Sequence, residues 1–148
     1  MRVMVIVKAT EQSEAGRVPD QTLLAAMMAF NDELVRAGVI LAGDGLTPSA
    51  RGARVRFSGG RTSVIDGPFA EAKELVAGYW VWQVRDLDEA IAWVRRMPTE
   101  DGRPGGAQSE VEIRPLMEAD DFGDQLTPEL RAQEAQLRST VAAKTSTV

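Results

Sequence analysis

The stretch Thr62-Ser-Val-Ile-Asp-Gly-Pro-Phe-Ala-Glu-Ala-Lys-Glu74 decides how this chain is organised. Two β-branched residues, Val64 and Ile65, favour a strand that ends there. The next three residues, Asp66-Gly67-Pro68, are typical of a turn, because Asp bonds nearby backbone N–H groups, Gly tolerates positive φ and Pro disfavours a helix before it. The stretch therefore predicts a strand, a tight turn and then a corner rich in charged groups.

Two interpretations of this turn stay open on the sequence. In the first, Asp66 caps the turn and Phe69 fills the core beneath it. In the second, Asp66 faces a small-molecule pocket, with Glu71 or Lys73 nearby. The first interpretation is favoured by the general use of Asp in turns, and the second makes the turn a candidate functional site.

Composition excludes several classes of function. A length of 148 residues predicts one domain with its own core. The net charge of −5 argues against nucleic acid as a partner. The chain has no cysteine and no histidine, which removes thiol chemistry, the commonest general base and the commonest metal ligands. No cofactor motif is present, and the apolar N-terminal run is too short for a signal peptide or a membrane span. We therefore expect a cytoplasmic protein with no metal, no cofactor and no membrane contact.

The first half of the chain predicts a strand, a helix and a second strand. Arg2–Lys8 has apolar residues on both faces, which is typical of a central strand. A polar loop is expected over Ala9–Val18. Helix signals and a 3.6-residue apolar period run from Asp20 to Ala37. A short strand over Val39–Ala42 and a Gly-rich loop through Pro48 follow.

The second half predicts a hairpin, a long strand, a helix and an edge strand. Arg54–Phe57 and Thr62–Ile65 form the hairpin, whose arginines either face water or make an anion site. Val76–Val84 is the long strand, with aromatic residues on both faces, and we expect one face to meet a partner subunit. Asp86–Met97 is a helix with a capping-box pattern at Asp86 and Glu89. A Gly/Pro loop at 100–106 and a strand ending at Pro115, on a sheet edge, complete the domain.

The remaining residues, 119–148, form an extension. After an acidic connector, Thr127-Pro128-Glu129 predicts a helix start, with Thr as N-cap and Pro at the first helical position. Apolar residues are sparse along this helix, which suggests weak packing or contact with a protein partner. We expect residues 139–148 to be frayed.

Several stretches together resemble one known family. They are Met1–Lys8, Ala37–Gly43, Asp66–Glu71, Gly78–Trp80, Asp86–Ala90 and Glu112–Pro115. In this order they resemble the DGPF-domain branch of the YCII-related family, over roughly residues 1–118. The resemblance implies an α+β fold, a ferredoxin-like βαββαβ unit that pairs into a dimeric α+β barrel.

The resemblance also implies two classes of function. Wider relatives include a chlorinated-hydroquinone dehydrochlorinase and are thought to use a His–Asp pair. In the family, histidine often follows the Gly-Leu pair, but here that residue is Thr47, so a dyad mechanism is discounted. DGPF-domain relatives are often encoded beside extracytoplasmic-function sigma factors, which implies a sensing role.

The sequence thus predicts a homodimeric binding protein with a small-molecule pocket near Asp66. An enzyme of lyase or hydrolase type, using a carboxylate base without histidine, is the alternative. A purely structural dimer is a third hypothesis. The candidate catalytic residues are Asp66 and Asp44, and the candidate ligand-binding residues are Lys8, Arg56, Gly67, Pro68, Phe69, Glu71, Lys73 and Tyr79.

Overall fold

The computed structural model of the chain describes residues 1–99 and 109–145, with the side chain of Lys73 excepted. The chain divides into two compact units, Met1–Pro115 and Leu116–Val148. Each unit is described separately below. The Gly/Pro loop expected at 100–106 lies outside the described residues.

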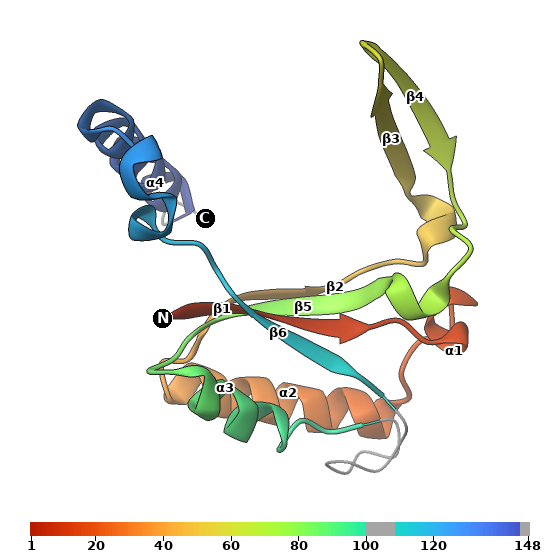
Figure 1. Cartoon of the computed structure of the whole chain (residues 1–148). Helices are drawn as coiled ribbons and strands as arrows, with labels where there is room; N and C mark the ends of the chain where they lie inside the picture. Colours follow the sequence, from red (N-terminus) through yellow and green to blue (C-terminus); the bar gives the residue numbers. More distant parts are fainter. Residues whose placement is uncertain (100–108, 146–148) are drawn as a thin grey trace. The chain divides into compact units, whose positions relative to one another are not determined.

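The first unit is built on a four-stranded antiparallel sheet (Figure 1). Its strands lie in the order β2 (Ile40–Gly45), β5 (Val76–Gln83), β1 (Arg2–Lys8) and β6 (Val111–Pro115). The helices α2 (Gln21–Arg36) and α3 (Leu87–Val94) connect β1 to β2 and β5 to β6. This order and connectivity are those of the ferredoxin-like βαββαβ unit. The α+β fold, the central place of β1 and the edge place of β6 are confirmed.

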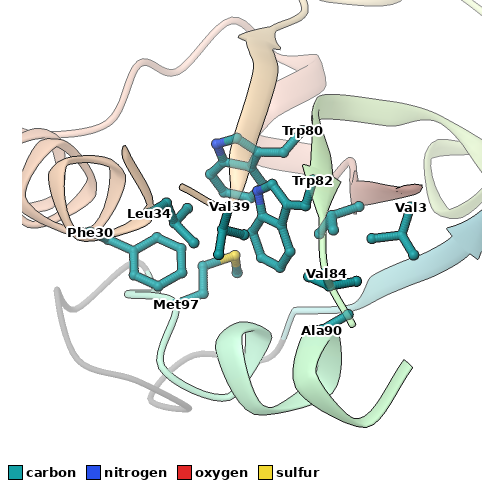
Figure 2. Packing of buried hydrophobic residues seen from close by; sticks show 10 residues of the cluster. Val3, Phe30, Leu34, Val39, Trp80, Trp82, Val84, Ala90 and Met97 are labelled. Atoms are coloured by element: carbon teal, nitrogen blue, oxygen red, sulfur yellow. The ribbon is translucent and has the colours of Figure 1, made fainter. Parts of the chain in front are cut away.

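The core lies between one face of the sheet and the two helices (Figure 1). Val3 and Val5 are two residues apart on β1, so both point to this face, and Trp80 and Trp82 of the neighbouring β5 do so for the same reason. The Phe30 ring of α2 meets both indoles nearly edge-on, with centroids 6.2 and 6.4 Å away. Figure 2 shows these side chains packed together with residues from α3 and the segment that follows it. Burying such rings stabilises the fold by area and by their edge-to-face geometry.

The opposite face of the sheet carries a second set of apolar side chains. Met4 and Ile6 of β1 lie opposite Val81 and Tyr79 of β5, so all four share this face. These residues are half-buried. Both long helices of the first unit lie on the other side (Figure 1), and we refer to this surface as the open face.

A separate two-stranded sheet is formed by β3 (Ala53–Ser58) and β4 (Arg61–Asp66). It confirms the predicted hairpin, and each strand extends one residue further at both ends. Val55 lies opposite Val64 on one face, and Arg56 lies opposite Ser63 on the other. Nearly every residue of the hairpin is exposed, including Phe57 at 79%.

The structure corrects three boundaries in the first unit. Residues Ala9–Val18 are not all loop, because α1 (Glu11–Glu14) forms there. Thr10 caps it by accepting the Ser13 N–H, and the Ser13 hydroxyl accepts the Thr10 N–H in return. The helix expected over Asp86–Met97 is α3, which ends at Val94. The strand expected over Val39–Ala42 is β2, which continues to Gly45, so the first three residues of the expected Gly-rich loop belong to the sheet.

The capping box predicted at the start of α3 is only half formed. The Asp86 carboxylate accepts the Glu89 N–H as expected. The Glu89 carboxylate instead accepts the N–H of Arg85 and its guanidinium N–H. These two bonds hold the pKa of Glu89 below its usual value of 4.5, and the backbone bond is the larger cause.

The second unit consists of the 3₁₀ segment η3 (Ala119–Gln125) and the helix α4 (Pro128–Thr145). The Thr127 hydroxyl accepts the Leu130 N–H, which confirms the predicted helix start. Fraying predicted from residue 139 is wrong as far as Thr145, because α4 is continuous to that residue. Among the described residues, no helix has the length and apolar character needed to cross a membrane.

Candidate functional site

A cavity of about 200 Å³ lies where β2 ends and β5 begins. Four segments far apart in the sequence contribute to its wall: α1, the segment after β2, the turn after β4, and the start of β5. Its lining is mainly apolar, with one carboxylate and two hydroxyls. The described lining residues are Glu14, Leu46, Thr47, Ser49, Phe69, Leu75 and Val76.

The carboxylate of Glu14 is held in place by Ser49. One carboxylate oxygen, Oε1, accepts the Ser49 N–H at 3.1 Å, and the other, Oε2, accepts the Ser49 hydroxyl at 2.5 Å. Ser49 opens the 3₁₀ segment η1 (Ser49–Arg51), where its N–H has no partner within the segment. Glu14 therefore caps η1 from a distant part of the chain.

The turn after β4 is fastened to the same serine. The Ser49 hydroxyl oxygen accepts the Phe69 N–H at 3.1 Å, and the Gly67 N–H donates to the Gly52 carbonyl at 3.1 Å. The Gly67–Pro68 peptide is cis. A Cβ atom at Gly67 would stand 1.7 Å from the Ser49 carbonyl oxygen, so only glycine allows this approach.

The ring of Phe69 lines the cavity and meets the base of the hairpin. The guanidinium carbon of Arg54 lies 3.9 Å from the centre of this ring, within the range of a cation–π contact. Ser49 and Phe69 thus connect the carboxylate, the cavity wall and the hairpin.

The predicted residues of the turn lie in different surroundings. Phe69 lines the cavity, and Gly67 packs against Ser49. Asp66 is exposed at the end of β4, opposite Ala53. Pro68 and Glu71 are exposed as well, and Glu71 immediately precedes the 3₁₀ segment η2 (Ala72–Glu74). The side chain of Lys73 lies outside the described part.

A second group of predicted residues lies on the open face. Asp44 of β2 is opposite Tyr79 of β5 in the ladder, which places the two side chains side by side on this face. Lys8 is at the end of β1 and pairs with Glu112 of β6, with 3.4 Å between the Lys8 Nζ and a carboxylate oxygen. Arg56 is separate, on the exposed hairpin. The sequence-based list therefore falls into a turn group, an open-face group and one hairpin residue.

The charge of Glu112 is stabilised by two cations. Hydrogen bonds from Arg114 and, next, from Lys8 hold the pKa of the Glu112 carboxyl below its usual value of 4.5. Lys8 thus has a carboxylate partner on its own sheet. Within the described side chains, no group of three or more carboxylates comes together as a metal site.

Sequence reasoning missed Glu14 and Ser49. Glu14 lies in the stretch expected to be a polar loop, Ser49 lies between the Gly-rich loop and the hairpin, where no element was predicted, and the two are 35 residues apart. The one local signal was the Thr10–Ser13 cap, which indicates a helical turn that carries Glu14. Thr47, where the resembled family often has histidine, does line the cavity.

Comparison with known proteins places the chain in a family. The sequence pattern of the YCII-related domain matches residues 1–118. The chain belongs to the YCII-related family. An uncharacterised protein, R00369, from Rhizobium meliloti (strain 1021) is 33% identical over 97 residues, which cover 66% of this chain and 75% of that protein.

A solved structure of a 5-chloro-2-hydroxyhydroquinone dehydrochlorinase from Burkholderia phenoliruptrix AC1100, in complex with 2,5-dihydroxybenzoquinone, is similar at a TM-score of 0.43. Its sequence is 14% identical, and the alignment covers 79% of this chain and 94% of that one. This likeness is too distant to bear on the chemistry of the YCII-related protein described here. Membership of the DGPF branch stays a prediction.

Proposed function

We propose that this YCII-related protein binds a small molecule in the cavity between α1, η1 and the cis-proline turn. The observation that carries the proposal is the Glu14 carboxylate, which is fixed by two hydrogen bonds from Ser49 in a largely apolar wall. Apolar surface with a few placed polar groups is the usual composition of a ligand site. Phe69, from the predicted ligand-binding set, belongs to this site.

A variant that fills the cavity tests the proposal. Leu46 lines the cavity and is 50% exposed, so Leu46→Trp can place its ring in the opening. Leu24 on α2, 45% exposed, is outside the cavity lining, and Leu24→Trp is the matched control. A metabolite library is screened by thermal shift on the native chain and both variants. A ligand at a hundred times its Kd adds about 2.7 kcal/mol of stability.

The proposal predicts stabilisation of the native chain and the control, and none of Leu46→Trp. Equal stabilisation of all three chains would place the binding site elsewhere. The open face, with Asp44 and Tyr79 side by side, would then be the next candidate.

We also propose that the protein is a homodimer through the open face. Support comes from Met4, Ile6, Tyr79 and Val81, whose side chains form an apolar surface away from the helices. Covering such a surface with a second copy removes apolar area from water. Sedimentation equilibrium of the native chain and of Val81→Lys tests this, since a charge at the centre of the face should give monomers. A native chain that is monomeric at micromolar concentration contradicts the proposal.

The role that we propose for ligand binding is sensing. The resemblance to proteins encoded beside extracytoplasmic-function sigma factors supports this role, and exposed apolar residues on α4, among them Leu137 and Val141, support a protein contact through the C-terminal extension. Purified sigma factor, titrated with the native chain and with Leu137→Lys, tests the contact. Equal binding of both chains would exclude α4 as the contact surface.

Catalysis by a carboxylate base is the second candidate function. The position of Glu14 beside an apolar cavity supports it, because a carboxylate at such a wall is suitably placed to accept a proton from a bound molecule. Asp66 and Asp44, the carboxylates expected from the sequence, are both exposed and stay predictions. Turnover that survives Glu14→Gln but is lost in Asp66→Asn would favour Asp66, the carboxylate predicted from the sequence, as the base.

A further inference from the structure

The size of the cavity limits what it can hold. Its volume is about 200 Å³. This is larger than an engineered protein cavity of roughly 150 Å³ that accommodates benzene. The ligand pockets of drug-sized molecules are larger, on the order of 300–1,000 Å³. The cavity is open to solvent at Leu46, so its enclosed part fits a single ring, or a short branched chain, with one or two substituents.

The polar groups of the cavity determine which substituent fits. The Ser49 hydroxyl has a single hydrogen, and it is donated to Glu14, since an ionised carboxylate only accepts. The same hydroxyl oxygen accepts the Phe69 N–H. The Ser49 hydroxyl therefore already donates its hydrogen and accepts one, and it has no hydrogen left for a ligand.

The Glu14 carboxylate retains free acceptor capacity. An ionised carboxylate offers about four lone-pair positions. The Ser49 N–H is shared between both oxygens, at 3.1 and 3.3 Å, and Oε2 also accepts the Ser49 hydroxyl, so the free acceptor capacity lies mainly on Oε1. Among the described side chains that line the cavity, Glu14 carries the only charge, and that charge is negative. Beside Glu14, a carboxylate or phosphate of a ligand is repelled and a hydrogen-bond donor is attracted, whereas the nearby Arg54 guanidinium lies against the Phe69 ring.

We propose that the cavity takes a compact apolar molecule that carries a hydrogen-bond donor, either a hydroxyl or an ammonium group, and that Glu14 accepts this donor. The apolar body lies against Leu46, Phe69, Leu75 and Val76. This inference rests on the proposed function and adds the chemical class of the ligand. It differs from the anion site that the arginines of the hairpin suggested from sequence.

Four probes that share one ring separate the alternatives. Benzylamine carries a cationic donor, benzyl alcohol a neutral donor, benzoate an anion without a donor, and toluene no polar group. Each is titrated into the full chain at millimolar concentration, and the backbone amide signals of Ser49 and Phe69 are followed by NMR. Benzylamine and benzyl alcohol can each donate a hydrogen bond to the charged Glu14 carboxylate, and toluene cannot. Both donors should therefore bind roughly tenfold to a hundredfold more tightly than toluene. Benzylamine ahead of benzyl alcohol would identify the ammonium group as the preferred donor, and the reverse order the hydroxyl.

Variants of two glutamates on α1 provide the control. Glu14→Gln removes the charge and keeps the shape of the side chain, and the expected loss of benzylamine affinity is at least about tenfold. Glu11→Gln makes the same change at an exposed residue of the same helix and should leave the affinity unchanged. Toluene or benzoate binding as tightly as the donors would overturn the ligand class and leave small-molecule binding intact. Failure of all four probes to move the two amides would overturn the ligand class and the use of this cavity together.

Discussion

Replacing Gly67 by alanine should disrupt the candidate site more than any other change of one methyl group in the turn. A Cβ at this position would stand 1.7 Å from the Ser49 carbonyl oxygen and 2.5 Å from its carbon. Ordinary contact begins at 3.4 Å, so the Ser49 backbone would have to retreat by about 1.7 Å. Both bonded partners of the Ser49 hydroxyl, Glu14 and the Phe69 N–H, would be strained by that movement.

The expected cost has two parts. Overpacking against backbone destabilises a protein by about 1–3 kcal/mol, and a weakened, partly buried hydrogen bond adds about 1 kcal/mol. Gly67→Ala should therefore lower the free energy of unfolding by about 2–4 kcal/mol. Because a domain is stable by roughly 5–15 kcal/mol, the variant should still fold, and urea titration can measure the loss.

A glycine without close neighbours provides the control. A Cβ at Gly45, the last residue of β2, would meet nothing within 4 Å. Gly45→Ala should change the free energy of unfolding by less than about 0.5 kcal/mol, or raise it slightly, since alanine restricts the unfolded chain. Equal stabilities of the two variants would refute the close packing of the turn against η1.

Two further predictions concern the core and the open face. Trp80 Nε1 donates to Asn31 at 3.0 Å, whereas Trp82 Nε1 is buried and has no partner within the described part of the chain. Trp80→Phe should therefore cost about 1 kcal/mol more than Trp82→Phe in urea unfolding, and the opposite order would contradict this pairing. The lowered pKa of Glu112, caused first by Arg114, stabilises the fold at neutral pH, and this contribution is lost as pH falls through the folded-state pKa below 4.5. The difference in Tm between the native chain and Glu112→Gln should shrink as pH is lowered through that range, and a difference independent of pH would exclude the effect.

Elements with strong periodicity could be predicted from the sequence. Arg2–Lys8 was identified as a central strand because both of its faces are apolar, and this position between β5 and β6 is confirmed. Helix α2 follows from its apolar stripe, its Asp20 cap and the Gly38 that follows it. In these segments, local pattern and tertiary packing agree.

The candidate site could be predicted only in part. Phe69 and Gly67 were recognised because turn chemistry is local. Glu14 and Ser49 were missed, since their contact joins the short helical segments α1 and η1 at a separation of 35 residues, and no local pattern encodes such a pairing. The placement of Asp44 and Tyr79 side by side needed the strand order, because it depends on the register between β2 and β5.

The most direct test of the account is an NMR titration of the native chain with the library compound that stabilises it most. The account predicts that the amide signals of Ser49 and Phe69 shift together and saturate with the same affinity, and that Leu46→Trp abolishes both shifts. Shifts confined to the open face, at Asp44 and Tyr79, would contradict the assignment of the cavity as the binding site.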